Sequence, residues 1–133
     1  EFKSGIYPQL SDAVSAVISF YPPESPLTVF SPDLQSSGKV QRYVPPQYSL
    51  PIDAYQYPHI AESVTKKMPP TLLIHGTADD LVPIENSEKI YAALLRKGVE
   101  ADFWVVEGAN HSDYKCFQTV IKERILGFLH LHL

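Results

Sequence analysis

The stretch that decides the fold is PPTLLIHGTADDLVPIENS, residues 69–87. Its apolar run, residues 71–75, is preceded by two prolines and followed by Gly76. A short apolar run between turn residues is typical of a strand that is buried on both faces, as in a parallel sheet. Two adjacent carboxylates, Asp79 and Asp80, follow where the run gives way to a turn. The stretch therefore predicts a buried strand that ends in an acidic loop.

The segments around this stretch alternate between strand and helix patterns. Residues 13–21 and 101–107 are rich in β-branched and aromatic side chains, which predicts two further strands. Residues 84–97 and 114–130 carry apolar side chains at helical spacing, and Gly98 suits a left-handed cap after the first of these helices. Strands that alternate with helices require crossover connections and a parallel sheet. The predicted fold class is therefore α/β, with three parallel strands and crossover helices.

A segment of different composition separates the first two predicted strands. Residues 22–70 hold ten of the twelve prolines and four of the eight tyrosines. A loop of this length inside a compact domain usually forms a lid or a binding insertion, so we expect a lid-like or pocket insertion here. Residues 59–68 could form a short helix at its end. The tyrosines are equally suited to packing and to a substrate wall: Tyr43, Tyr48, Tyr55 and Tyr57.

Composition excludes several classes of function. The chain has 133 residues, a formal net charge of −4 and no block of Lys or Arg, which argues against a nucleic-acid partner. No apolar stretch approaches the roughly 18 residues of a membrane span. Cys116 is the single cysteine, which excludes an intrachain disulfide and mildly favours a reducing compartment such as the cytoplasm. Residues 1–2, Glu-Phe, are interpreted as a remnant of an EcoRI cloning site, and the chain as a fragment.

Candidate catalytic residues follow two of the predicted strands. Asp79 and Asp80 come after the strand at 71–75, and His111, in EGANHSDY, comes after the strand at 101–107. Ligands of open parallel sheets bind beyond the carboxyl ends of the strands. If these strands are neighbours, an acid and an imidazole emerge at the same edge. A carboxylate that accepts from one ring nitrogen fixes the tautomer and leaves the other nitrogen free as a base.

These motifs carry a family resemblance. The sequence HGTADDLVP, followed by VVEGANH, resembles the C-terminal part of serine esterases with the α/β-hydrolase fold. It looks closest to the small carboxylesterase, feruloyl-esterase-like and prolyl-oligopeptidase-like branches. The resemblance covers nearly the whole chain and implies one partial domain over residues 1–133, with residues 22–70 where relatives put lid or pocket elements. It implies that Asp79 is the catalytic acid and His111 the catalytic base.

The resemblance also implies a nucleophile that this sequence lacks. The family's serine lies in a Gly-x-Ser-x-Gly turn between a strand and a helix, and no such pattern occurs in the 133 residues. In the family's order the serine comes first, yet only twelve residues precede the strand at 13–21. Ser4 precedes Gly5 but has no glycine two positions before it. The oxyanion-hole donors should be missing as well, so we expect the chain alone to be inert.

Each of these residues also has a structural interpretation. The family register favours Asp79 over Asp80, which would then be a solvated turn carboxylate or a helix N-terminal charge. Taken alone, His111 could be a loop histidine bonded to nearby backbone. His75 is more suited to a structural role, because a histidine at a strand end can bond to neighbouring loops.

Polar residues near His111 and at the chain end have simpler interpretations. Asn110 and Ser112 flank the histidine and should shape its loop. Cys116 is expected to be a packed small residue rather than a nucleophile. His130 and His132 alternate with leucine at the end of the chain and are expected to lie in a frayed helix terminus, not in a metal site.

The leading hypothesis is the C-terminal portion of a serine hydrolase that cleaves small or aryl carboxylic esters, with no metal or organic cofactor. One alternative is a peptidase of the prolyl-oligopeptidase type, and another is a non-catalytic binding module that retains the fold. Three strands without the rest of their sheet leave an apolar edge. We therefore expect self-association or pairing with a missing N-terminal half.

Overall fold

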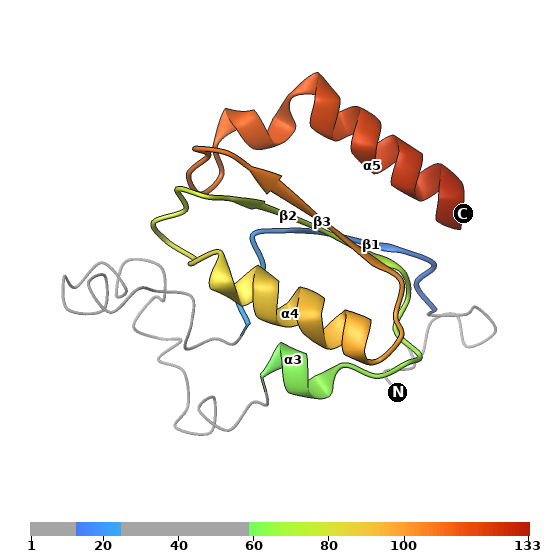
Figure 1. The fold of residues 1–133 in the computed structure, drawn as a ribbon. Helices are drawn as coiled ribbons and strands as arrows, with labels where there is room; N and C mark the ends of the chain where they lie inside the picture. Colours follow the sequence, from blue (N-terminus) through green and yellow to red (C-terminus); the bar gives the residue numbers. More distant parts are fainter. Residues whose placement is uncertain (1–12, 25–58) are drawn as a thin grey trace, which may run out of the picture.

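A computed structural model describes residues 13–24 and 59–133 of the chain (Figure 1). The described elements are listed here in chain order: strand β1 (Val17–Phe20), helix α3 (Ile60–Ser63), strand β2 (Thr71–Gly76), helix α4 (Glu85–Arg96), strand β3 (Ala101–Val106), the 3₁₀ helix η4 (Tyr114–Phe117) and helix α5 (Thr119–His132). Most of the predicted insertion, including its four tyrosines, lies outside the described residues. The lid-like role of residues 22–70 therefore stays a prediction.

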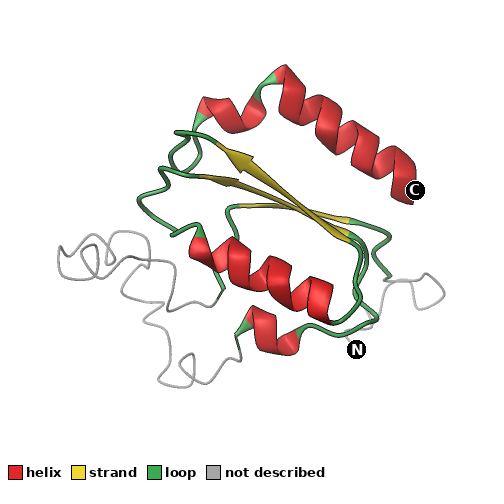
Figure 2. Cartoon of the chain, in the orientation of Figure 1, coloured by secondary structure: helices red, strands yellow, loops and turns green. Residues whose placement is uncertain are grey.

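The three described strands form one parallel sheet in the order β1-β2-β3. Val17 of β1 is in register with Thr71 of β2, which is in register with Ala101 of β3. Helices α3 and α4 cover one face of the sheet and α5 covers the other (Figures 1 and 2). The predicted α/β class, with a parallel sheet covered on both faces, is confirmed.

The central position of β2 in the sheet explains why the sequence of this strand is mostly apolar. All six of its residues are buried. Leu73 points to the α4 face, where it packs with Ile90 and Leu94. Its neighbours in the strand, Leu72 and Ile74, point to the α5 face, as successive side chains of a strand must. Each fully buried Leu or Ile contributes about 1.5–3 kcal/mol to stability, so this strand anchors both halves of the core.

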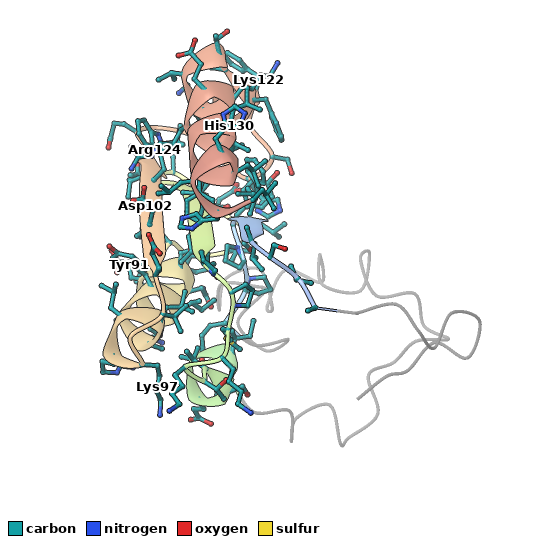
Figure 3. The ribbon with its side chains drawn as sticks, turned by 90° about the vertical axis from the view of Figure 1, so that its right-hand side faces the viewer. Tyr91, Lys97, Asp102, Lys122, Arg124 and His130 are labelled. Atoms are coloured by element: carbon teal, nitrogen blue, oxygen red, sulfur yellow. The ribbon has the colours of Figure 1, made fainter. Side chains whose placement is uncertain are left out.

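An ion pair joins the sheet to its last helix. Arg124 of α5 pairs with Asp102 of β3, and the two side chains lie near each other in Figure 3. The guanidinium of Arg124 also lies 5.0 Å from the ring centroid of Trp104. On the same helix, Ile121 and Phe128 are buried against the sheet. The helix is therefore held by an apolar face and by the ion pair of Arg124.

The structure corrects two predicted element boundaries. β1 begins at Val17 rather than at residue 13, because residues 13–15 are exposed and outside the ladder. The predicted helix at 114–130 is two helices. The Asp113 side chain accepts from the Lys115 N–H and caps η4, and Gln118 is then extended, with φ −66° and ψ 160°. Gln118 therefore separates η4 from α5.

The C-terminus is more ordered than expected. α5 continues to His132, whose ring lies 4.4 Å from that of Phe128 and whose Nε2 lies 3.7 Å from Oε1 of Glu100. The prediction of a frayed terminus is therefore wrong for His132. Within residues 13–24 and 59–133, no group of three or more His, Cys, Asp or Glu side chains could hold a metal.

Helix α4 ends as its sequence predicts. Gly98 has a φ of +70°, and the Val99 N–H donates to the Leu94 carbonyl at 3.0 Å. The left-handed glycine cap is confirmed.

The predicted helix at 59–68 is shorter, since α3 spans only Ile60–Ser63. None of the described helices is both long enough and apolar enough to cross a membrane.

Candidate active site

The loops after β2 and β3 lie against each other at the carboxyl edge of the sheet. The Thr77 N–H donates to the Val106 carbonyl at 3.1 Å, and the Ala78 N–H donates to the Ala109 carbonyl at 3.0 Å. Gly76 makes this approach possible, because a Cβ at this position would lie 2.1 Å from the Ala109 carbonyl oxygen. The two loops that carry the candidate acid and histidine are therefore joined through their backbones.

Asp79 is held at the centre of this junction. Its side chain has no exposed surface. Its Oδ1 atom accepts from the Leu81 and Val82 N–H groups, at 3.0 Å and 2.8 Å. Burial by itself would raise the pKa of the Asp79 carboxyl, but hydrogen bonds from two imidazoles and two backbone N–H groups outweigh it and lower the pKa to about 2. The side chain is therefore a carboxylate at neutral pH.

His111 lies beside the second oxygen of this carboxylate. Its Nδ1 is 2.9 Å from Asp79 Oδ2. Because an ionised carboxylate can only accept, Nδ1 carries the hydrogen and donates it. No described residue bonds the other ring nitrogen, Nε2, and 24% of the side chain is exposed. The histidine is thus oriented by the acid and keeps one basic nitrogen free at the edge of the site.

Asn110 fixes the backbone on both sides of this pair. Its Oδ1 atom accepts from the His111 N–H at 2.6 Å and from the Asp80 N–H at 3.2 Å. Ser112, on the other side of His111, has a φ of +57°. These contacts agree with the prediction that Asn110 and Ser112 shape the histidine loop. Asp80 itself is exposed, as expected for a turn carboxylate.

Tyr21 lies at this candidate site, although the sequence did not single it out. Its ring lies 4.4 Å from the imidazole of His111, tilted by 53°. It follows β1 directly, and its φ of +38° turns the chain at the carboxyl end of the strand. The same rule that pointed to the loops after β2 and β3 applies to β1, so its strand-end position was the available signal.

Two buried side chains near the Asp79–His111 pair were also considered in the sequence, His75 and Cys116. His75 is fully buried at the end of β2, with its Nδ1 2.6 Å from Ser87 Oγ and its Nε2 2.8 Å from the Val82 carbonyl. The expected bonding of His75 to neighbouring loops is confirmed. Cys116 is also buried, and burial first, then nearby carboxylates, raises the pKa of its thiol. Cys116 is therefore a packed thiol, as predicted.

A model of the prolyl oligopeptidase family matches residues 30–133, which is more than half of the chain. The chain belongs to the prolyl oligopeptidase family. Among the curated relatives, the non-reducing polyketide synthase mapC of Penicillium roqueforti is 41% identical over 66 residues, covering 50% of this chain and 2% of that protein. The chain thus corresponds to a small part of this much longer relative.

Solved structures share the fold. A sugar hydrolase, YeeB, from Lactococcus lactis is 25% identical with a TM-score of 0.60, covering 86% of this chain and 46% of that chain. A thermophilic esterase from Thermogutta terrifontis is 20% identical with a TM-score of 0.60, covering 97% of this chain and 48% of that chain. The chain therefore spans just under half of each of these structures. The α/β-hydrolase fold and the membership of a hydrolase family, both implied by the sequence resemblance, are confirmed.

Proposed function

We propose that this chain supplies the acid and the base of a Ser-His-Asp hydrolase that cleaves carboxylic esters. The observation that carries the proposal is the hydrogen bond of 2.9 Å from His111 Nδ1 to Asp79 Oδ2. It leaves Nε2 available to take the proton of a serine hydroxyl and to return it to the leaving alcohol. Asp79 keeps the imidazole in the required tautomer and stabilises its charged form.

The charge state of Asp79 supports this role. A carboxyl with a pKa of about 2 stays ionised at any pH at which a hydrolase of this kind works. Its negative charge can then balance the imidazolium that forms when His111 accepts a proton. The carboxylate is buried, so water screens this interaction little.

The nucleophile has to come from another segment of the complete enzyme. The 133 residues contain no Gly-x-Ser-x-Gly pattern, and the Cys116 thiol is buried with a raised pKa. The oxyanion-hole donors of this fold belong to the nucleophile turn and to an earlier loop. We therefore propose that the isolated chain is inert and that pairing with the nucleophile segment restores the triad.

Two other classes of substrate are alternatives to a simple ester: a proline-containing peptide and a polyketide acyl chain. The family name makes a proline-containing peptide bond the first alternative. The relatives named non-reducing polyketide synthases reach 55% identity over 42 residues, which favours a polyketide acyl chain as the second. An oxygen ester, a thioester and an amide all react through a tetrahedral intermediate at the carbonyl, so the same serine, histidine and acid serve each of them.

Substrate profiling of the complete hydrolase tests the proposal. We expect turnover of aryl acetates to exceed that of proline-containing peptides. Turnover of acyl thioesters is measured in the same assay, and faster cleavage of these thioesters than of aryl acetates would favour the polyketide alternative. Faster cleavage of the peptides would overturn ester hydrolysis in favour of a peptidase. The sequence of the parent gene before residue 1 tests the remaining alternative, because a degenerate Gly-x-Ser-x-Gly turn would indicate a binding module.

A further inference from the structure

A buried histidine, His75, lies next to the candidate acid. His75 has no exposed surface, and both of its ring nitrogens have polar partners. Its Nε2 is 3.3 Å from Asp79 Oδ2, the same oxygen that His111 approaches at 2.9 Å. Two imidazoles therefore face one carboxylate oxygen, one buried and one partly exposed.

The partners of His75 determine where its hydrogen lies. The Val82 carbonyl, 2.8 Å from Nε2, can only accept, so Nε2 carries a hydrogen. In the neutral ring Nδ1 then has a lone pair, and it accepts from the hydroxyl of Ser87 at 2.6 Å. Ser87 is itself fully buried in the first turn of α4. The Val82 carbonyl therefore sets the tautomer of His75, and the buried hydroxyl of Ser87 pairs with the remaining ring nitrogen.

This tautomer directs an N–H group toward the acid. With Nε2 protonated, the positive end of the bond faces both the Val82 carbonyl and the Asp79 carboxylate. With the opposite tautomer, a lone pair would face two acceptors in a buried site, which is strongly unfavourable. The Val82 carbonyl and the Asp79 carboxylate thus select this tautomer, and the hydroxyl of Ser87 supports it by donating to Nδ1.

The carboxylate is consequently restrained at both oxygens. Oδ1 accepts two backbone N–H groups of the following turn, at 3.0 Å and 2.8 Å. Oδ2 is 3.3 Å from Nε2 of His75 and 2.9 Å from Nδ1 of His111. A carboxylate has about four lone-pair sites, so this arrangement leaves little freedom for the group to rotate away from His111. Of the hydrogen bonds that lower the pKa of Asp79, the one from His75 has the largest effect.

We propose that Ser87 and His75 are positioning residues, which form a buried hydrogen-bond relay that orients Asp79 toward His111. The catalytic consequence rests on the proposed function, whereas the relay itself does not. Loss of the Ser87 hydroxyl should leave the buried Nδ1 of His75 without a hydrogen-bond donor, so that the ring shifts, its contact with Asp79 weakens and the carboxylate can turn. His111 would then lose its fixed orientation without losing any atom of its own.

The first test uses the native 133-residue chain and needs no variant. Nitrogen-15 shifts of the His75 ring report which nitrogen carries the hydrogen. We expect Nε2 to be protonated and Nδ1 to be unprotonated at neutral pH. A ring with its hydrogen on Nδ1 alone would overturn the relay.

The second test compares Ser87→Ala with Ser87→Thr, which keeps the hydroxyl. We expect the pKa of the Asp79 carboxyl, followed by carbon-13 NMR, to rise from about 2 toward 3.8 in Ser87→Ala and to recover in Ser87→Thr. The Nδ1–H resonance of His111 should shift in the same order. The control is Ile90→Val, a mild change in the apolar face of α4 that should move neither signal. An unchanged Asp79 pKa in folded Ser87→Ala would overturn the proposal.

Kinetics of the complete hydrolase separate this proposal from the proposed function. Ser87→Ala should lower kcat about 5- to 10-fold, the rate equivalent of one neutral hydrogen bond, with KM unchanged. Ser87→Thr should restore it. An unchanged kcat in folded Ser87→Ala, beside an active native enzyme, would overturn the relay's catalytic role. An inactive native enzyme would overturn the proposed function instead, while the NMR results would still decide whether the relay exists.

Discussion

His111 Nδ1 lies 2.9 Å from Asp79 Oδ2, although the two residues are 32 positions apart in the chain. The parallel register of the sheet produces this contact. Gly76 at the end of β2 is paired with Val106 at the end of β3, so the loops after both strands start side by side. Backbone hydrogen bonds then keep the two loops together up to the acid and the histidine. The pair is therefore built by sheet topology rather than by local sequence.

Acid should remove the stabilisation that Asp79 provides. The pKa of its carboxyl is lowered from 3.8 to about 2, so the folded state binds this proton less readily than the unfolded chain. The contribution is present above about pH 4 and is lost as the pH falls through the folded pKa; it amounts to at most roughly 2–3 kcal/mol. Urea unfolding of the native chain and of Asp79→Asn, at pH 6 and at pH 2.5, measures it. Equal acid losses in both proteins would contradict the assignment.

Gly76→Ala should disrupt the junction of the two loops. The added Cβ would lie 2.1 Å from the Ala109 carbonyl oxygen, so the backbone has to move. We expect a loss of roughly 3 kcal/mol in the free energy of unfolding, as for severe overpacking. The matched control is Gly127→Ala in α5, where the new Cβ would meet no described residue within 4 Å apart from its own stretch of helix, and where stability should rise by up to about 1 kcal/mol. Similar effects of both substitutions in thermal unfolding would contradict the close approach at Gly76.

Replacing the Tyr21 ring should loosen His111. The two rings are 4.4 Å apart, and an aromatic pair of this kind contributes about 0.5–1.5 kcal/mol beyond the area it buries. Tyr21→Leu should therefore increase side-chain motion of His111 in NMR relaxation and lower kcat of the complete hydrolase. Tyr21→Phe keeps the ring and should behave as the native protein does. A loss of the same size in Tyr21→Phe would mean that the hydroxyl, not the ring contact, matters.

The open sheet edge should drive association of the isolated chain. Within residues 13–24 and 59–133, β1 pairs only with β2, and its other side has no strand partner. Unpaired edge strands are prone to add a further strand. Light scattering over a range of concentrations should therefore show dimers or larger species. A monomer at every concentration, with cooperative unfolding, would contradict this prediction and the expected pairing with a missing half.

The strongest local signals in the sequence predicted the elements around the site. Residues 71–75 lie between prolines and a glycine, and the strand they predicted extends only one residue further, to Gly76. Helix α4 begins and ends within one residue of the predicted range, because Pro83 and Gly98 mark its two ends. That an acid would meet His111 was expected if the two strands were neighbours, because both loops follow the carboxyl ends of parallel strands. The choice of Asp79 over Asp80 came from the family resemblance.

Features that depend on tertiary contacts were not visible in the sequence. The break at Gln118 has no proline or glycine to mark it, and the apolar spacing continues across it. The positive φ of Tyr21 is unusual for a bulky residue, so propensity alone would not predict it. His132 is ordered because Phe128 and Glu100 lie beside it, and Glu100 is distant in sequence. The contact of His132 with Glu100, in particular, joins residues that come together only in the folded chain.

The kcat for an aryl acetate, measured on the complete hydrolase and on its His111→Ala and Asp79→Asn variants, tests the central claim most directly. We predict that both substitutions lower kcat by at least about 10³-fold, while the isolated 133-residue chain stays at the background rate. A His111→Ala enzyme that hydrolyses the ester at the native rate would contradict the assignment of this pair. Robust hydrolysis by the isolated chain would contradict the claim that its nucleophile lies elsewhere.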